Sequence, residues 1–307
     1  MAVFVNDRLR PRQVEHVLRD ADADVLFASG EALARMGGGL ATRATKIIVG
    51  HPVPAHPFEP GHSTGEDAAQ IIYTSGSTGL PKGVVFTHGA IIAGVEATAG
   101  YLGLRPSDRI ASLLPFSAVY GLNQLLCTIA SGTALVVDTS VLAADICATL
   151  RRESVTVAAT VPPLWLQLLD VPDFLTPLPS LRQMQNAGGH LPTSAVRRLR
   201  SAQPQAELFL QYGMTETWRS TFLSPEYTDT RPGSMGRALP GAEILVVRDD
   251  GTRCDPGEPD ELVHAGAMIG AGLDAVAACQ VAMVNPITDD PELAEALMEI
   301  VNAHFAV

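Results

Sequence analysis

The alternation of short apolar runs with longer helical patterns constrains the fold of this chain most strongly. The pattern predicts helices over residues 87–102, 120–130, 141–153, 162–169 and 193–203, and strands over residues 109–114, 133–137, 155–160, 183–186 and 207–211. Strands that alternate with helices in this way favour a mainly parallel sheet with helices on both faces. We therefore predict an α/β fold, in which ligands bind beyond the carboxyl ends of the strands.

The two ends of the chain have patterns of predicted elements that differ from that of the middle. Residues 1–50 predict a helix, a strand, a second helix and a second strand, with the two strands, 25–28 and 46–49, short and buried. From Thr221 onward, strand-like runs at 243–247 and 261–264 are separated by Asp-Gly and Pro-Gly turn signals. These features predict an α/β core over residues 1–220 and a small antiparallel β subdomain over residues 221–272. The tail predicts a strand at 275–284 and a helix at 291–304.

A loop of small residues lies between two apolar, strand-like runs and ends in Pro81-Lys82-Gly83. It consists of Thr74, Ser75, Gly76, Ser77, Thr78 and Gly79. Backbone N–H groups of such a loop can turn inward on an anion, and Lys82 adds a mobile positive charge. The G-x-x-x-x-G-K-[ST] spacing of the nucleoside triphosphatase P-loop is absent. A flexible linker is the alternative, and the short length between two strand-like runs disfavours it. The sequence therefore predicts a different kind of phosphate-binding loop.

A second group of chemically useful side chains follows the predicted strand at 207–211. It consists of Gln211, Tyr212, Gly213, Met214, Thr215 and Glu216. The tyrosine offers a flat face on which a base can stack, and the glutamate offers a hard oxygen ligand for Mg²⁺. The alternative is an ordinary strand end followed by a turn.

Adjacent glycines follow the predicted strand at 183–186. Gly188 and Gly189, with His190 after them, permit close approach of the backbone to a planar ligand, although an ordinary turn fits equally well. The small-residue loop, Gly188-Gly189 and Tyr212-Gly213 each follow a predicted strand. We expect all three to line one edge of the fold.

The string Tyr-Thr-Ser-Gly-Ser-Thr-Gly-Leu-Pro-Lys-Gly-Val, which begins at Tyr73, resembles the signature loop of the AMP-forming adenylating enzymes. This family comprises acyl-CoA synthetases, luciferases and peptide-synthetase adenylation domains, and the resemblance extends from about Val3 to Gly272. It implies an acyl-CoA synthetase-like fold whose loop and Lys82 hold the β- and γ-phosphates of ATP. It also implies that Gly188-Gly189 lies along the adenine, that Tyr212 stacks on it, and that Thr215 and Glu216 contact the α-phosphate and Mg²⁺. Lys82, Thr215 and Glu216 are then the catalytic residues.

The activity implied by the resemblance is ATP-dependent conversion of a carboxylic acid to an acyl-adenylate, followed by transfer to CoA. The expected cofactors are ATP, Mg²⁺ and CoA, and the expected partner is a small-molecule carboxylate. Amino-acid adenylation and a non-catalytic nucleotide-binding remnant remain alternatives. Ser117, Val119 and Tyr120 occupy the segment where many family members face the carboxylate substrate, with no histidine there. Trp165 borders either the acyl pocket or the hydrophobic core.

Several parts of the family pattern are missing. The chain starts inside the pattern, lacks the Tyr-x-Thr-Gly-Asp and Gly-Arg-x-Asp segments, and has no lysine after Lys82. We expect a chain truncated at the N-terminus that lacks most of the C-terminal domain, with residues 273–307 as a remnant of that domain. Loss of the second lysine is expected to cost about 3–4 kcal/mol of transition-state stabilisation. Missing strands leave a sheet edge that favours self-association or a complementing chain.

Composition excludes other classes of function. A net charge of −12 disfavours a nucleic-acid surface, because phosphate backbones bind basic patches. The four cysteines form no C-x-x-C pair, which favours free thiols in the cytoplasm. Asp274 and Gln280 interrupt the apolar stretch at 265–284, so no membrane span is expected.

Overall fold

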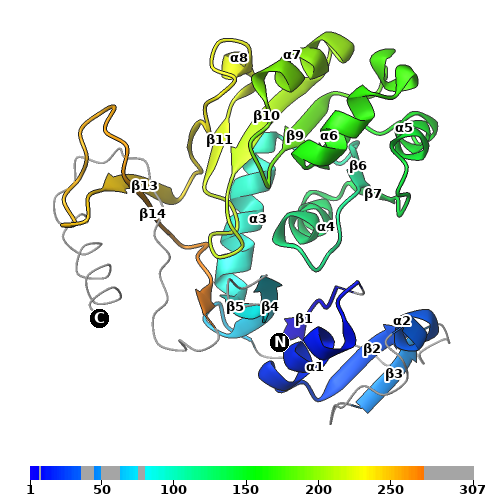
Figure 1. Ribbon diagram of the computed structural model, residues 1–307, viewed down its shortest axis with the longest axis vertical. Helices are drawn as coiled ribbons and strands as arrows, with labels where there is room; N and C mark the ends of the chain where they lie inside the picture. The colour runs from blue at the N-terminus through cyan, green and yellow to red at the C-terminus, as the bar shows by residue number, and fades with distance from the viewer. Residues whose placement is uncertain (7, 36–44, 50–62, 75–79, 273–307) are drawn as a thin grey trace.

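A seven-stranded sheet forms the centre of the computed structural model, which describes residues 1–6, 8–35, 45–49, 63–74 and 80–272 (Figure 1). The strand order is β12–β11–β10–β9–β8–β6–β7. The strands are β6 (Arg109–Ser112), β7 (Ala134–Val137), β8 (Val157–Thr160), β9 (Gln183–Asn186), β10 (Glu207–Tyr212), β11 (Thr221–Leu223) and β12 (Arg237–Ala238). Strands β6 to β10 run parallel, and β11 and β12 add antiparallel strands at one edge. The predicted α/β fold with a mainly parallel sheet is confirmed.

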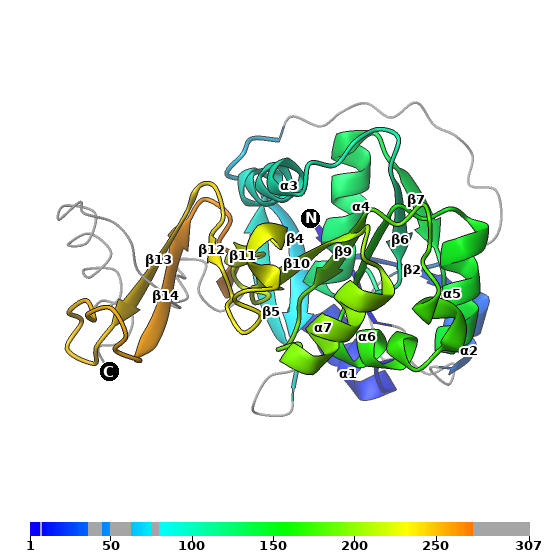
Figure 2. The same cartoon turned by 90° about the horizontal axis from the view of Figure 1, so that it is seen from above.

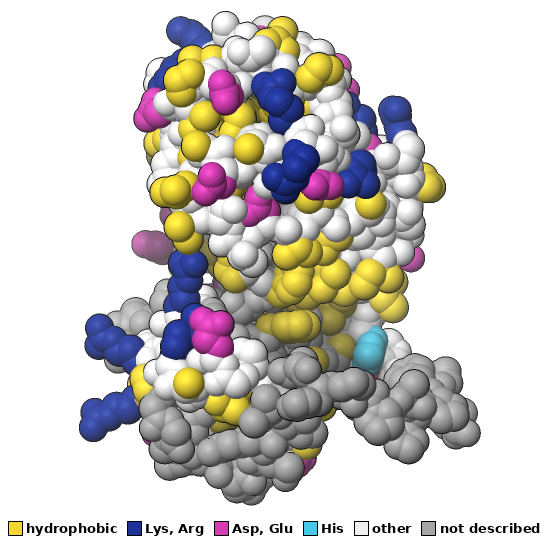
Figure 3. All heavy atoms as spheres, turned by 90° about the vertical axis from the view of Figure 1, so that its right-hand side faces the viewer, with side chains coloured by type: hydrophobic (Ala, Val, Ile, Leu, Met, Phe, Trp, Pro, Cys, Tyr) yellow, Lys and Arg dark blue, Asp and Glu magenta, His cyan; other side chains and the backbone are white. Residues whose placement is uncertain are grey.

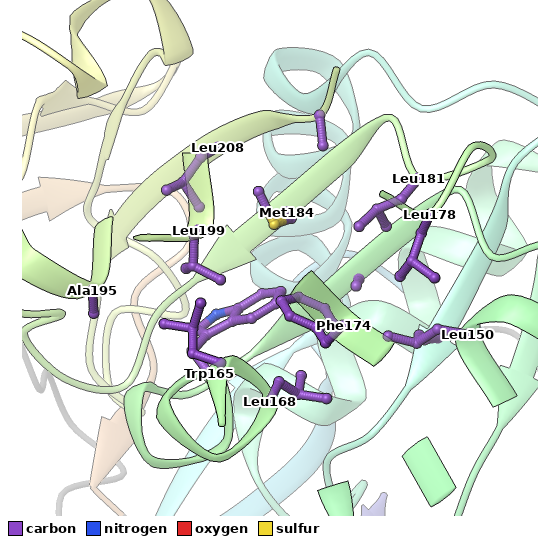
Figure 4. Packing of buried hydrophobic residues seen from close by; sticks show 14 of the residues in the cluster. Leu150, Trp165, Leu168, Phe174, Leu178, Leu181, Met184, Ala195, Leu199 and Leu208 are labelled. Atoms are coloured by element: carbon purple, nitrogen blue, oxygen red, sulfur yellow. The ribbon is translucent and has the colours of Figure 1, made fainter. Parts of the chain in front are cut away.

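One face of this sheet is covered by α5 (Ala143–Arg152), α6 (Pro162–Leu169) and α7 (Thr193–Ala202). Figure 4 shows Trp165 and Leu168 of α6 packed with Phe174 of the short 3-10 helix η1 (Pro172–Leu175) beneath Met184 of β9. Trp165 is fully buried, with its ring centroid 6.4 Å from that of Phe174. Of the two roles considered for Trp165, the structure supports core packing.

The other face carries α3 (His88–Leu102) and α4 (Val119–Ser131). These helices also pack on a four-stranded sheet, ordered β1–β4–β5–β15. Its strands are β1 (Ala2–Val3), β4 (Ala68–Thr74), β5 (Lys82–Thr87) and β15 (Ala271–Gly272). One hydrophobic cluster joins Phe86 of β5, Val95 of α3 and Phe209 of the large sheet. The helix expected over residues 87–102 is confirmed, and it begins after Thr87, whose hydroxyl accepts from the Ala90 N–H at 3.2 Å as an N-cap.

The N-terminal part contains the predicted order of elements: α1 (Pro11–Asp20), β2 (Val25–Ser29), α2 (Gly30–Arg35) and β3 (Thr45–Val49). Strands β2 and β3 pair in parallel as a separate two-stranded sheet. The prediction that the strand at 25–28 is buried is wrong, because Val25 is 44% and Phe27 63% exposed. Only the face that carries Leu26 packs against the helices, whereas a fully buried strand needs cover on both faces.

Strands β13 (Ala242–Val247) and β14 (Glu261–Gly266) form an antiparallel hairpin with its own small core. Figure 2 shows this hairpin projecting from the rest of the chain. The sequence pattern changes at Thr221, and this position lies inside the large sheet, because β11 and β12 pair there. The short helix α8 (Pro225–Thr228) lies between these two strands in the chain. The separate hairpin begins at Ala242. The strand expected at 275–284 and the helix expected at 291–304 lie outside the described residues.

Strand β7 is an edge strand of the large sheet, and Val137, Val141 and Leu142 at and after its end are exposed. Figure 3, which views the molecule from the side where β7 and α5 lie, shows hydrophobic side chains at the surface below a region rich in charged ones. Within the described part of the chain, no helix has the length and apolar character to cross a membrane.

Candidate functional site

A pocket of about 460 Å³ lies at the carboxyl ends of β9 and β10. It is lined by Asn186, Gly188, Gly189, His190, Leu191, Leu210, Gln211, Tyr212, Gly213, Pro232, Gly233, Ser234 and Met235. Strands β9 and β10 are parallel neighbours, with Asn186 opposite Leu210, so the segments that follow them emerge side by side. Gly188-Gly189 and Tyr212-Gly213 therefore meet at one pocket. Their nearest residues, Gly189 and Tyr212, are 23 positions apart in sequence.

The Gly188-Gly189 segment is held by the end of β9. The Asn186 side-chain amide donates to the Gly189 carbonyl at 3.2 Å, and Gly188 has a φ of 75° that favours glycine. Gly188, Gly189 and His190 are exposed at the pocket. The backbone at these positions is thus accessible to a flat ligand.

Tyr212 is half-buried at the end of β10. Burial raises the pKa of its phenol, and the nearby charge of Glu216 raises it further. A Cβ atom at Gly213 would lie 2.8 Å from the Cα of Arg219, so only glycine lets the chain turn here without displacement. The tyrosine ring, the adjacent glycine and the Gly188-Gly189 backbone are suitable surfaces for a purine base.

The turn that follows Tyr212 is anchored by a buried hydrogen-bond chain. The Thr217 hydroxyl accepts from the Met214 N–H at 3.2 Å and lies 2.9 Å from the Ser220 hydroxyl, which contacts Nδ1 of His264 at 3.0 Å. Burial lowers the pKa of His264 to about 4, so its imidazole is neutral at pH 7. No local sequence pattern indicates this role of His264, because its partner Ser220 is 44 residues away.

Thr215 and Glu216 lie in this turn, and both are half-buried. No group of three or more His, Cys, Asp or Glu side chains suited to a metal ion occurs among the described residues. Mg²⁺ bound with nucleotides usually takes only one or two protein carboxylates, together with phosphate oxygens and water. The single carboxylate of Glu216 in this turn fits this donor set.

Ser75, Gly76, Ser77, Thr78 and Gly79 of the predicted phosphate loop lie outside the described residues. The flanks of this loop are described: Thr74 ends β4, Lys82 begins β5, and the two residues pair directly. The Lys82 side chain is exposed. The loop therefore joins two strands of the four-stranded sheet, whereas the other two predicted segments follow strands of the large sheet.

Gly270 connects the turn that follows β10 to the four-stranded sheet. Its N–H donates to the Glu216 carbonyl at 2.7 Å. A Cβ atom at Gly270 would lie 2.6 Å from Val84 and 2.8 Å from Phe86, both on β5. The turn that carries Glu216 is thus tied through one glycine to the strand that begins with Lys82.

Sequence patterns did not reveal every residue that lines the pocket. Gly233, Ser234 and Met235, in the segment between α8 and β12, also line the pocket. The Thr221 hydroxyl on β11 donates to the Met235 carbonyl at 2.7 Å and holds this segment against the sheet. The Pro-Gly-Ser turn before it was the available signal, but turns of this composition are common.

The segment expected to face a carboxylate substrate begins α4. Tyr120 is buried there, and its hydroxyl donates to the Gln185 carbonyl of β9 at 3.1 Å. Ser117 and Val119 are half-buried. The Tyr120 side chain therefore links α4 to β9, the strand that leads to the pocket.

Comparisons with known proteins find similar sequences and similar structures. The sequence profile of the AMP-binding enzyme family matches residues 1–273, and that of the CbbQ/NirQ/NorQ C-terminal family matches residues 260–304. The second match covers most of residues 273–307, the region expected to be a remnant of an adenylating C-terminal domain.

Relatives with curated names include a 2-succinylbenzoate–CoA ligase of Bacillus licheniformis, 29% identical over 88% of this chain and 56% of that protein. Another is an L-proline–[L-prolyl-carrier protein] ligase of Pseudomonas fluorescens, 27% identical over 87% of this chain and 57% of that protein. The o-succinylbenzoate coenzyme A synthetase of Bacillus subtilis in complex with AMP is 26% identical, with a TM-score of 0.78 over 90% of this chain and 57% of that one. The chain thus spans a little more than half the length of these proteins. With the family profile matched over residues 1–273, the chain belongs to the AMP-binding enzyme family.

Proposed function

We propose that this chain binds ATP in the pocket at the carboxyl ends of β9 and β10 and activates a carboxylic acid as an acyl-adenylate. The observation that carries this proposal is the convergence of Gly188-Gly189 and Tyr212-Gly213 on one pocket of about 460 Å³. A flat half-buried tyrosine, an accessible glycine backbone and a carboxylate four residues after the tyrosine are the groups that a magnesium-bound adenine nucleotide requires.

Each residue has a defined role in this proposal. Tyr212 stacks on the adenine, and Gly188-Gly189 lies along it, with His190, Gln211, Gly213 and Met214 completing the nucleotide site. Thr215 contacts the α-phosphate, Glu216 holds Mg²⁺, and Lys82 with the loop at 74–79 holds the β- and γ-phosphates. Magnesium, when bound, neutralises charge that develops on the phosphates.

The proposed reaction follows from these positions. A substrate carboxylate oxygen forms a bond to the α-phosphorus of ATP, the bond from that phosphorus to pyrophosphate breaks, and pyrophosphate leaves. A thiolate then attacks the acyl carbon, and AMP leaves with the bonding electron pair. CoA is the proposed acceptor, because the relative from Bacillus licheniformis is named a CoA ligase. The described cysteines are buried free thiols, which supports a reducing, cytoplasmic setting.

A second candidate is amino-acid adenylation, because the relative from Pseudomonas fluorescens is named for proline and a carrier protein. The two candidates differ in the acid that supports the first half-reaction. Exchange of label between pyrophosphate and ATP measures that half-reaction alone.

The test is ATP–pyrophosphate exchange across a panel of aryl, fatty, dicarboxylic and amino acids. We expect exchange with a non-amino carboxylic acid, reduced by roughly 10²–10³ in Lys82→Ala and Glu216→Gln, the usual effect of removing one transition-state donor. Arg198→Gln is the control, because Arg198 is exposed on α7 and pairs with Asp170. Exchange with amino acids only would favour the second candidate. ATP binding without exchange for any acid would contradict the proposed activity.

A further inference from the structure

Arg219 is a buried cation for which the described part of the chain supplies no counter-ion. Its residue is 2% exposed, and no carboxylate among the described residues lies within ion-pair distance of it. One terminal nitrogen donates to Oε1 of Gln211, while Nε has no hydrogen-bond partner in the described part of the chain. Buried arginines are normally paired, because removing a charge from water costs several kcal/mol unless it is compensated.

The guanidinium lies between the nucleotide pocket and α4. Its partner Gln211 lines the pocket and also donates through Nε2 to the Tyr101 hydroxyl of α3 at 2.7 Å. On the other side, the guanidinium carbon lies 4.7 Å from the ring centroid of Tyr120. Arg219 therefore reaches the segment of α4 that the sequence indicates as facing the substrate.

The groups around Arg219 are neutral at physiological pH. Burial raises the pKa of both the Tyr101 phenol and the Cys127 thiol to about 12, even though Arg219 acts in the opposite direction on both. Burial also raises the pKa of the Tyr120 phenol. None of these three side chains can supply the negative charge that Arg219 lacks.

The face of α4 toward the sheet has further unsatisfied polar atoms. Tyr120, Asn123, Gln124 and Cys127 share this face by their helical spacing, and all four are buried. Nδ2 of Asn123 and Oε1 of Gln124 have no hydrogen-bond partner among the described residues. Buried polar atoms without partners are rare, and two of them on one helix face, near a cation with no counter-ion among the described residues, indicate a polar ligand.

We infer that Arg219 binds a second carboxylate of the substrate, so that this chain selects dicarboxylic acids. One carboxylate is activated beside Thr215, as the proposed function requires, and the other accepts hydrogen bonds from Arg219 Nε and from the Asn123 amide. A charge-assisted hydrogen bond of this kind is roughly twice as strong as a neutral one. A monocarboxylic acid of similar shape leaves the buried cation unpaired.

The test compares straight-chain dicarboxylic acids of increasing length with their monomethyl esters, titrated into the full chain by calorimetry, with and without Mg·ATP. Each ester keeps one carboxylate and removes the second charge. For the best-fitting length, we expect the diacid to bind at least about tenfold more tightly than its ester, as expected for a hydrogen bond between charged groups. Arg219→Gln is expected to bring this ratio near one, Arg219→Lys to retain part of it, and Arg198→Gln to leave it unchanged.

Equal affinity of the wild-type chain for diacids and esters, or binding of neither, would overturn the inference. A folded Arg219→Gln variant that keeps the full preference would also overturn it. If Arg219→Gln does not fold, the comparison within the wild-type chain and the Arg219→Lys variant decide. A parallel titration with Mg·ATP separates the two proposals, because a diacid preference without ATP binding contradicts the proposed function and supports this inference.

Discussion

Gly236 and Gly241 lie in the same segment beside the pocket, and both have φ near +80° (85° and 80°). They differ in the space around them. A Cβ atom at Gly236 would overlap with the carbonyl oxygen of Phe222, whereas one at Gly241 meets nothing within 4 Å. We expect Gly241→Ala to lower the free energy of unfolding by about 1–2 kcal/mol, the cost of a left-handed residue. Gly236→Ala adds the displacement of β11 and is expected to cost at least about 2 kcal/mol more.

Urea denaturation of the two alanine variants and the wild-type chain measures this difference. Similar midpoints and slopes for the two variants would show that Gly236 does not contact β11 as described. The comparison isolates the steric contribution, because φ is nearly the same at both positions.

His264 predicts a pH dependence of stability. Its pKa is about 4 in the folded chain, against an ordinary value near 6.5, because burial disfavours the charged form. Unfolding therefore takes up a proton between these pH values, and the free energy of unfolding falls as the pH is lowered from about 6.5 to about 4. The loss is at most roughly 3 kcal/mol.

Denaturation of the wild-type chain and of His264→Gln at several pH values tests this. The variant is expected to be less stable at pH 7, because it loses the bond to Ser220, but to lose less stability between pH 6.5 and 4. Parallel pH profiles for the two proteins would contradict a buried neutral His264.

At the residue scale, local sequence was sufficient for some of the site and not for the rest. Tyr212, Gly213 and Gly188-Gly189 were predictable because each forms a short motif at a strand end. His264 and Met235 contribute through partners that are 44 and 14 residues away in sequence, and no local pattern encodes such contacts.

Helix α3 links the site to the four-stranded sheet through the space at Gly94. A Cβ atom there would lie 2.6 Å from the indole of Trp218, whose ring also packs edge-on against Phe86 with centroids 5.3 Å apart. Trp218 belongs to the turn that carries Glu216. We expect Gly94→Ala to shift this turn, to weaken Mg·ATP binding and to lower the free energy of unfolding by about 1–3 kcal/mol, the usual cost of overpacking.

Gly100→Ala is the matched control, because Gly100 lies on the same helix with nothing within 4 Å of an added Cβ. It is expected to raise stability by about 0.5–1 kcal/mol through helix propensity and to leave ATP binding unchanged. Calorimetry and urea denaturation measure both effects. Equal behaviour of the two variants would contradict the proposed coupling of α3 to the site.

At the element scale, helices and parallel strands were well predicted. The bounds of α6 and β9 agree with the expected ranges, because proline, strand composition and period mark them locally. The partners of strands were harder to infer. The pairing of β11 with β10, and of β4 with β5 in a separate sheet, depends on contacts that the pattern of one strand does not contain.

At the scale of the whole molecule, the site depends on two sheets held together by α3, α4 and the segment around Gly270. The large sheet supplies the segments expected to bind the base, and the four-stranded sheet supplies Lys82 and the flanks of the phosphate loop. With a net charge of −12, the chain must attract ATP through these local groups and not through its overall field. Nucleotide binding is therefore the property on which the remaining proposals depend.

Calorimetric titration of Mg·ATP into the full chain, its Tyr212→Ala variant and a Tyr227→Ala control tests this most directly. Tyr227 is an exposed tyrosine on α8 that is not among the residues that line the pocket. Stacking of a base on an aromatic ring is worth about 1–3 kcal/mol. We predict saturable binding to the wild-type chain, unchanged in Tyr227→Ala and weakened by at least about fivefold in Tyr212→Ala. Absence of binding to the folded wild-type chain, or equal affinity in Tyr212→Ala, would contradict the proposed nucleotide site.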